Sequence, residues 1–287
     1  MTITADYPTP ARQAAYDPQR PVPERPAWVF LGLILVGAVL LGVGWTTWDV
    51  VDRQSVTDEA RFAAVGSVDL RELGSSPVTV VGSDRTDALL TRTVSWRGSG
   101  QPARTERVEA GTLVVESACA GLGGCNAGYQ LQIPRAATVR ATLSSGDLDV
   151  RAVAGVWARA SSGDVEAQDV AGPVTAETSS GTIAVCRVAG EVTLRTTSGG
   201  IDGCDLGGAR ATLETSSGSL TASFRGPIER IDARSTSGSV RLTVPDAAYD
   251  VRSTTRSGGQ DIRVRTDIGA AGKIAVTTTS GSIRVAS

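Results

Sequence analysis

The side chains that could carry out chemistry in this sequence are four cysteines and a small group of acidic residues. The chain contains no histidine. Without histidine there is no histidine general base, no serine–histidine–aspartate triad and no histidine metal ligand. Lys273 is the only lysine among the 28 basic residues, and it follows a glycine in what reads as a turn. The sequence therefore predicts no catalytic residue and no cofactor, and we expect a protein that is not an enzyme.

The four cysteines form two pairs that are close in sequence. Cys119 and Cys125 flank a short Ala-Gly-Leu-Gly-Gly loop, and Cys186 and Cys204 follow two successive glycine turns at the same position. Neither spacing is the two to four residues that separate paired zinc ligands. We therefore favour two disulfides over a four-thiolate metal site, and disulfides indicate an oxidising compartment.

The acidic residues that could bind a cation follow two neighbouring glycine turns. Asp147 and Asp149 come after Gly146, and Asp164 and Glu166 occupy the same positions after the next turn. Stacked carboxylates of this kind can bind Ca²⁺. The position directly after the glycine is no longer acidic in the following turns, where it is Thr182, Gly200 and Ser219. Solvated turn residues are thus the simpler interpretation, with a weak Ca²⁺ site as the alternative.

These residues lie in a repeat that must position them. Eight glycines, each preceded by Ser and before that by Ser, Thr or Arg, recur at nearly regular intervals: Gly146, Gly163, Gly181, Gly199, Gly218, Gly238, Gly258 and Gly281. Such regularity is typical of stacked repeats. A flexible Ser/Gly-rich stalk is disfavoured, because aliphatic residues recur at fixed positions relative to each glycine.

Two aliphatic columns accompany these glycines. Before the glycines the chain has Val139, Val156, Val174, Val192, Ala211, Ile231, Val251 and Ile274, always at the same distance. After them it has Leu148, Val165, Ile183, Ile201, Leu220, Val240 and Ile283, and Ile262 fits if Gly259-Gln260 is an insertion. Small or apolar residues alternate with polar ones, which predicts strands with one buried face.

A second glycine turn follows about half a period after each of the first five, so each repeat should contain two short strands and two tight turns. The fold class is therefore all-β. We expect a two-sided β-solenoid of about eight short rungs over residues 138–287, preceded by an N-terminal β cap over 61–137.

Three further expectations follow from the stacking. Cys186 and Cys204 have the same phase in adjacent rungs, which brings their Cα atoms within disulfide distance. The hydroxyl residues three positions before the glycine should face inward and fill a narrow corner: Thr178, Thr196, Thr215 and Thr255. The last repeat, ending at Ser287, should form the exposed end of the stack.

Residues 27–48 are uncharged and mostly apolar, and as a helix they would extend roughly 33 Å, enough to cross a bilayer. Arg12, Arg20 and Arg25 precede this segment, which places the N-terminus in the cytoplasm and the repeats outside. An uncleaved signal-anchor helix is favoured over a cleaved signal peptide. Residues 1–26 contain six of the 12 prolines and are expected to be a disordered cytoplasmic tail, and 49–60 a linker.

Positive charge is concentrated towards the end of the chain, where residues 221–287 contain ten basic and six acidic side chains. Five arginines form the candidate contact with an anionic surface: Arg252, Arg256, Arg263, Arg265 and Arg284. Arg263 and Arg265 are expected on one strand face. An anionic cell-wall polymer, lipid headgroups or another envelope protein would be the partner. Ordinary solubility is the simpler interpretation, and nucleic acid is not expected.

The segments GYQLQIP (128–134) and ATVRATLSSGDLDV (137–150), followed by the repeated Ser-Ser-Gly and Thr-Ser-Gly turns, resemble the bacterial putative-adhesin family of β-strand-repeat domains, also called toastrack domains. The resemblance covers roughly residues 60–287 and implies a fold more than a function. It also implies an envelope protein, in some members linked to envelope stress. The family supplies no catalytic residues.

The sequence thus predicts a single-pass bacterial membrane protein with an extracytoplasmic, non-catalytic repeat domain that acts as an envelope scaffold, an adhesin-like module or a sensor. Two alternatives stay open. One is a polysaccharide-binding or glycan-processing β-helix, and the other is an envelope-stress signalling partner that acts through its cytoplasmic tail.

Overall fold

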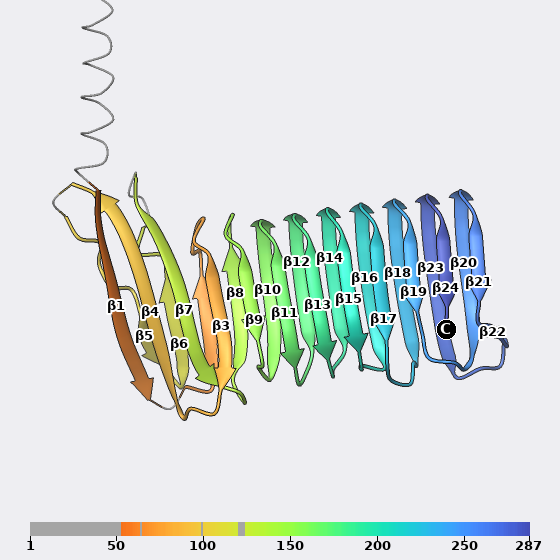
Figure 1. The fold of residues 1–287 in the computed structure, drawn as a ribbon, viewed down its shortest axis with the longest axis horizontal. Coiled ribbons are helices and arrows are strands. Elements are labelled where there is room, and N and C mark those ends of the chain that lie inside the picture. Colours follow the sequence, from red (N-terminus) through yellow and green to blue (C-terminus); the bar gives the residue numbers. More distant parts are fainter. Residues whose placement is uncertain (1–52, 64, 99, 120–123) are drawn as a thin grey trace, which may run out of the picture. The chain divides into compact units, whose positions relative to one another are not determined.

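The computed structural model describes residues 53–63, 65–98, 100–119 and 124–287, and these residues fold into 24 β-strands (Figure 1). Arg53–Ser287 is one compact unit. Within the described residues no helix is long and apolar enough to cross a membrane. The predicted tail (1–26) and membrane helix (27–48) lie outside the described residues.

The strands form two sheets of 12 strands each, here named sheet A and sheet B. In spatial order sheet A consists of β1 (Arg53–Ala63), β4 (Asp87–Arg97), β7 (Asn126–Pro134), β3 (Val78–Ser83), β9 (Leu148–Arg151), β11 (Val165–Val170), β13 (Ile183–Val188), β15 (Ile201–Leu206), β17 (Leu220–Phe224), β19 (Val240–Thr243), β24 (Ile283–Ala286) and β21 (Gln260–Arg263).

Sheet B consists, in spatial order, of β22 (Arg265–Thr266), β20 (Ala248–Ser257), β23 (Gly272–Ser280), β18 (Arg230–Ser237), β16 (Arg210–Ser217), β14 (Val192–Ser198), β12 (Val174–Ser180), β10 (Gly155–Ser162), β8 (Thr138–Leu143), β2 (Ser67–Arg71), β6 (Thr112–Glu116) and β5 (Arg107–Glu109). Strand pairs are parallel except β1–β4, β4–β7 and β5–β6. The predicted all-β fold of stacked parallel strands is confirmed.

The core lies between the two sheets and is built from in-register columns. Val156 pairs with Val139 on one side and Val174 on the other, and Val165 pairs with Leu148 and Ile183. These aliphatic side chains are almost completely buried. The two predicted aliphatic columns are therefore the inner faces of the two sheets, and burial of apolar surface along them stabilises the stack.

The repeated glycine is required by a close approach between neighbouring turns. A Cβ atom placed on Gly199 would lie 2.0 Å from the carbonyl oxygen of Gly181, and one on Gly218 would lie 2.0 Å from that of Gly199. Both glycines also have positive φ angles, 156° and 155°. A side chain is thus excluded at these positions both by space and by backbone conformation.

The hydroxyl residues three positions before the glycine face inward, as predicted. Thr196 Oγ1 donates a hydrogen bond to the Gly181 carbonyl (3.2 Å), and Thr215 Oγ1 donates one to the Gly199 carbonyl (3.1 Å). Both side chains are buried. Each hydroxyl therefore satisfies a carbonyl of the neighbouring turn at a buried corner of the rung.

The order of the last rungs differs from the prediction. Strands β23 and β24, which end the chain, lie between β18–β19 and β20–β21, so the chain passes over one position and then returns to fill it. The exposed end is therefore formed by residues 248–266 rather than by the last repeat. Burial explains the exchange, because the inward residues of the last repeat, Ile274, Val276, Ile283 and Val285, are aliphatic and fully buried.

The outermost rung is polar at positions where the neighbouring rung is apolar. Gln260, and not Ile262, pairs in register with Ile283, so the predicted two-residue insertion is wrong. Ser253 pairs with Val276, and its hydroxyl donates to Gln260 Oε1 at 2.5 Å. Polar inward residues at an open sheet edge oppose pairing with another chain. We therefore interpret Ser253 and Gln260 as a polar cap on the stack.

At the other end, residues 53–60 belong to strand β1, where the sequence predicts a linker over 49–60. Strand β1 pairs with β4 along its whole length. Arg92 of β4, with a side chain only 3% exposed, forms ion pairs with Asp58 of β1 (3.1 Å) and with Glu106 (3.2 Å). These charge contacts and the packing of Val56 and Phe62 against the core explain why this weakly apolar segment is a strand.

The polar cap predicts a change in assembly. Replacing Ser253→Val and Gln260→Ile together should make the outer rung as apolar as its neighbours and produce end-to-end dimers or larger species. Light scattering coupled to size-exclusion chromatography measures the mass directly. The matched control is Thr254→Val with Thr266→Ile, two exposed positions at the same end, and it should leave the mass unchanged. Equal masses for both variants would contradict the cap.

Candidate functional site

The four acidic residues that the sequence offers as a weak Ca²⁺ site are used within the protein. Asp147 Oδ1 accepts a hydrogen bond from the Asp164 amide (3.0 Å), and Asp164 Oδ1 accepts one from the Thr182 amide (2.7 Å). Both carboxylates therefore link one turn to the next. Their neighbours are also engaged, since Asp149 pairs with Arg151 at 3.0 Å and Glu166 accepts a hydrogen bond from the Gln168 side-chain amide.

The structure does not gather these carboxylates around one point. In the part of the chain that the structure describes, no group of three or more Asp, Glu, Cys or His side chains is placed to hold a metal ion. The geometry of these acids favours turn-to-turn hydrogen bonding over cation binding.

Both predicted disulfides are present. The Cα atoms are 5.4 Å apart in Cys119–Cys125 and 4.5 Å apart in Cys186–Cys204. Cys186 and Cys204 face each other in register from β13 and β15, which confirms that they share a phase in adjacent rungs. Their side chains lie on the outward face of sheet A, so this disulfide joins two rungs at the surface and not in the core.

The five distal arginines are divided between the two sheets. Arg263 ends β21 in sheet A and Arg265 lies in β22 of sheet B, so the predicted shared strand face is wrong: the chain crosses between sheets at Val264. Arg284 of β24 also belongs to sheet A, whereas Arg252 and Arg256 lie in β20 of sheet B.

Four of these arginines have acidic partners. Asp261 pairs with Arg263 (2.8 Å) and with Arg284 (3.6 Å). The other two pairs are Arg252–Asp250 (3.5 Å) and Arg265–Asp246 (3.3 Å). Four arginines thus share three aspartates, which reduces the positive charge of this end without removing it.

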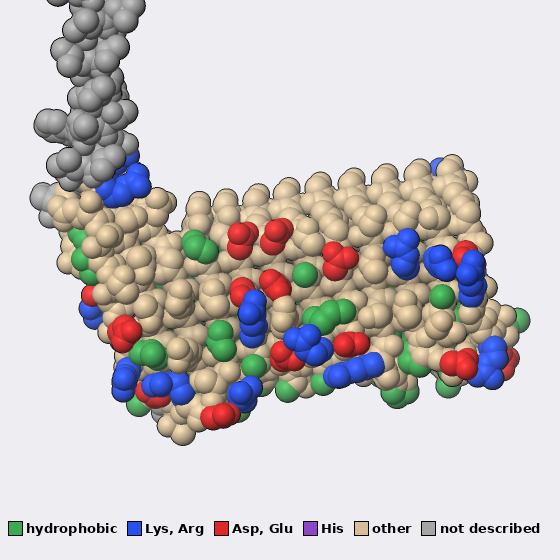
Figure 2. Space-filling model, in the orientation of Figure 1, with side chains coloured by type: hydrophobic (Ala, Val, Ile, Leu, Met, Phe, Trp, Pro, Cys, Tyr) green, Lys and Arg blue, Asp and Glu red, His purple; other side chains and the backbone are tan. Residues whose placement is uncertain are grey.

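The outward face of sheet A changes sign along the stack. One in-register row contains Asp149, Glu166 and Asp202 on β9, β11 and β15, followed by Arg241 and Arg284 on β19 and β24. Figure 2 shows this face, with acidic side chains over β9–β15 and basic ones over β19 and β24. The row can present opposite charges to the two ends of an extended partner.

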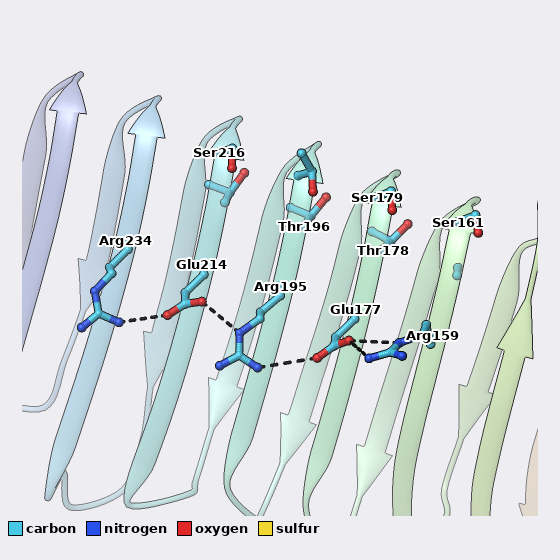
Figure 3. Close-up of a pocket in the computed structure, with 13 residues that line it drawn as sticks. Arg159, Ser161, Glu177, Thr178, Ser179, Arg195, Thr196, Glu214, Ser216 and Arg234 are labelled. Atoms are coloured by element: carbon cyan, nitrogen blue, oxygen red, sulfur yellow. Dashed lines mark hydrogen bonds and ion pairs between the residues drawn. The ribbon is translucent and has the colours of Figure 1, made fainter.

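The outward face of sheet B has a ladder of alternating charges, one residue from each of five successive strands (Figure 3). Glu177 contacts Arg159 at 2.6 Å and Arg195 at 3.6 Å, and Glu214 contacts Arg195 and Arg234 at 2.9 Å each. The hydrogen bond from Arg195 holds the pKa of Glu214 below its ordinary value, and the Arg195 pKa is raised in turn. We name these five residues the charge ladder.

Rows of hydroxyl groups run on both sides of the charge ladder. Ser161, Ser179, Thr197 and Ser216 are exposed on one side, toward the glycine turns. Thr175, Thr193 and Thr212 form an in-register row on the other side. The ladder and the first of these rows line a shallow groove of hydrogen-bond donors and acceptors that repeat once per rung.

Sequence reasoning missed one outward residue of a different kind. Trp157 of β10 stands in the same row as Thr175, and the Arg140 guanidinium lies 4.0 Å from its ring centre. The sequence could have revealed it, because Trp157 lies between the inward residues Val156 and Ala158 and must therefore face outward. An outward tryptophan is unusual in a chain with 4% aromatic residues.

Comparison with known proteins identifies the fold. The family model described as Toastrack DUF4097 matches residues 122–286. A putative adhesin from Bacteroides fragilis superposes with a TM-score of 0.50 at 13% identity, covering 81% of this chain and 97% of that one. A putative lipid binding protein from Parabacteroides distasonis gives a TM-score of 0.40 at 13% identity, covering 82% and 97%.

A putative cell adhesion protein from Clostridium sporogenes gives a TM-score of 0.32 at 9% identity, covering 81% of this chain and 98% of that one. No curated protein matches this sequence. At such identities the likeness is one of fold.

The charge ladder predicts how stability depends on pH. Because its pKa is lowered in the folded state from an ordinary value of 4.5, Glu214 stabilises the fold above about pH 4.5, and this contribution is lost as pH falls through the folded pKa. Melting temperatures measured by circular dichroism from about pH 7 to about pH 3 should fall less steeply for Glu214→Gln than for the unmodified protein.

The control for this prediction is Asp202→Asn, because Asp202 is outward-facing and forms no ion pair among the described residues. Its pH profile should match that of the unmodified protein. A Glu214→Gln profile with an unchanged slope would show that the ladder contributes nothing to acid sensitivity.

Proposed function

The chain belongs to the Toastrack DUF4097 family, and from this premise we propose that it is a non-catalytic binding module displayed on the outer side of a bacterial membrane. In this proposal residues 27–48 are the membrane helix, 1–26 the cytoplasmic tail and 138–287 a solenoid of about eight rungs. The β cap over 61–137 extends back to residue 53, where β1 begins.

The observation that supports binding over catalysis is the repetition of the two outward faces. The charge ladder, the hydroxyl rows beside it and the sheet A row that changes charge sign each consist of residues at the same repeat position on successive strands. The acidic residues of the ladder are each paired with two arginines. This arrangement presents many equivalent polar contacts and suits an extended polymer or protein surface better than one small substrate.

Two further observations agree with a role at the cell envelope. Both cysteine pairs form disulfides, which persist in oxidising compartments outside the cytoplasm. The solved structures with this fold include a protein described as a putative adhesin. We propose that this chain likewise acts by adhesion or scaffolding, with the distal arginines contributing contacts to an anionic envelope surface.

The proposal is tested by co-sedimentation of residues 53–287, the compact unit, with bacterial cell-wall sacculi and with anionic liposomes at low and high salt. Exposed charges are screened by salt, so binding through the distal arginines should weaken at high salt. A variant with Arg252, Arg256, Arg263, Arg265 and Arg284 all changed to Gln should lose this binding.

The matched control changes five exposed arginines of the cap, Arg53, Arg61, Arg71, Arg107 and Arg135, to Gln. It alters the net charge equally and should bind as the unmodified protein does. Absence of sedimentation with either surface, or equal losses in the two variants, would contradict a specific contact through the distal rungs.

A further inference from the structure

Trp157 is placed differently from the other aromatic residues of the structure. Among the described residues, Phe62, Trp96, Tyr129, Phe224 and Tyr249 pack in or against the core. Trp157 instead lies on the outward face of sheet B, where the next three rungs have Thr175, Thr193 and Thr212. An outward tryptophan in a row of threonines contributes nothing to the core, and tryptophan is enriched at binding surfaces.

A hollow of about 530 Å³ lies beside the indole. It is located where the cap strands β2 and β6 meet the first rungs, β8, β10 and β12. Trp157 and Pro173 supply apolar surface, and polar groups come from Ser67, Asp69, Thr112 and Thr138. The hollow therefore combines one flat aromatic wall with several hydroxyl groups.

The charged side chains that line this hollow are one carboxylate, Asp69, and one guanidinium, Arg140. The Arg140 guanidinium stacks on the indole at 4.0 Å, which orients its N–H groups without an ion pair among the described residues. Asp69, in register with Arg140, is neutralised by Arg71 at 2.7 Å. A cationic ligand would thus be opposed by Arg140, whereas a neutral ligand that both donates and accepts hydrogen bonds can use the Asp69 carboxylate and the Arg140 guanidinium together.

We propose that the hollow beside Trp157 binds a neutral hexopyranose residue of a polysaccharide. The C–H groups on one face of a sugar ring are apolar and complement the negative face of the indole, which here is the ring face that the Arg140 guanidinium does not cover. The sugar hydroxyls, which donate and accept, match the hydroxyls of Ser67 and Thr138, the Asp69 carboxylate and the Arg140 guanidinium. This proposal rests on the proposed function, because it names the ligand class of the same binding module.

The structure also gives the direction of the glycan. From the hollow, the row Thr175, Thr193 and Thr212 continues across successive strands at intervals of roughly 4.8 Å. A linear glycan that enters beside Trp157 therefore runs along the stack, perpendicular to the strands, with one hydroxyl side chain available on each rung. The first sugar gains the aromatic contact and the following sugars gain hydrogen bonds.

The test uses the full chain in mild detergent and affinity electrophoresis through gels that contain a linear β-glucan, a mannan or a galactan. At least one of these neutral polymers should retard the protein, equally at low and high salt, because the contact involves no net charge. Trp157→Thr, which introduces the residue of the neighbouring rungs, should weaken the retardation roughly tenfold.

The matched control is Arg225→Thr, an exposed position in the turn that follows β17, outside the charge ladder and the hydroxyl rows. It should leave the retardation unchanged. Retardation by none of the three polymers, or retardation that survives in Trp157→Thr, overturns the proposal. Retardation only by an acidic polymer, in a salt-dependent manner, also overturns it and assigns Arg140 to an anionic ligand.

The outcomes of this test and of the sacculus experiment are separable. Trp157→Thr should not change salt-sensitive sedimentation through the distal arginines. Loss of sedimentation in the variant with the five distal arginines changed to Gln does not test sugar binding beside Trp157. Either proposal can therefore fail while the other stands.

Discussion

The contact on which the rest of this structure depends is the approach of each turn glycine to the carbonyl oxygen of the neighbouring turn. The approach recurs along the whole stack, from Gly163 against the Gly146 carbonyl to Gly258 against the Gly281 carbonyl. Because only a residue without Cβ fits, the glycine turns of successive rungs must lie directly over one another, and each strand must end at the same position in its repeat. An inward hydroxyl then bonds the same carbonyl, as Thr196 does with Gly181. Register between strands is thus fixed at the corner of each rung.

This fixed register explains how side chains that could bind a partner are arranged on the surface. Residues of one phase form straight rows across both sheets, so the charge ladder and the threonine row beside it follow from the repeat itself. Single exposed ion pairs contribute only about 0–1 kcal/mol, and the core supplies most of the stability. Outward positions are therefore free to vary, and a change such as Trp157 in place of threonine can specialise one rung without disturbing its neighbours.

Much of this architecture could be predicted from the sequence, since glycine turns, aliphatic columns, the paired cysteines and the inward threonines all depend on local phase. The order of the last rungs could not, because the period says which residues share a phase but not which repeat stacks on which. For the same reason the sequence wrongly predicted that Ile262 would align with Ile283, a position that Gln260 occupies. It also wrongly predicted that Arg263 and Arg265 would share one strand. The Trp157–Arg140 contact depends on side-chain directions on β8 and β10, which are adjacent in sheet B but not consecutive in the sequence.

The most direct test of the glycine contact compares Gly218→Ala with Gly200→Ala by thermal and chemical denaturation. A Cβ on Gly218 would lie 2.0 Å from the Gly199 carbonyl oxygen, whereas one on Gly200 would come no closer than 3.5 Å to any neighbour. Gly218→Ala should lower the free energy of unfolding by about 2 kcal/mol or more, and Gly200→Ala should change it by less than about 1 kcal/mol. Equal stability of the two variants would contradict the dependence of the stack on this contact.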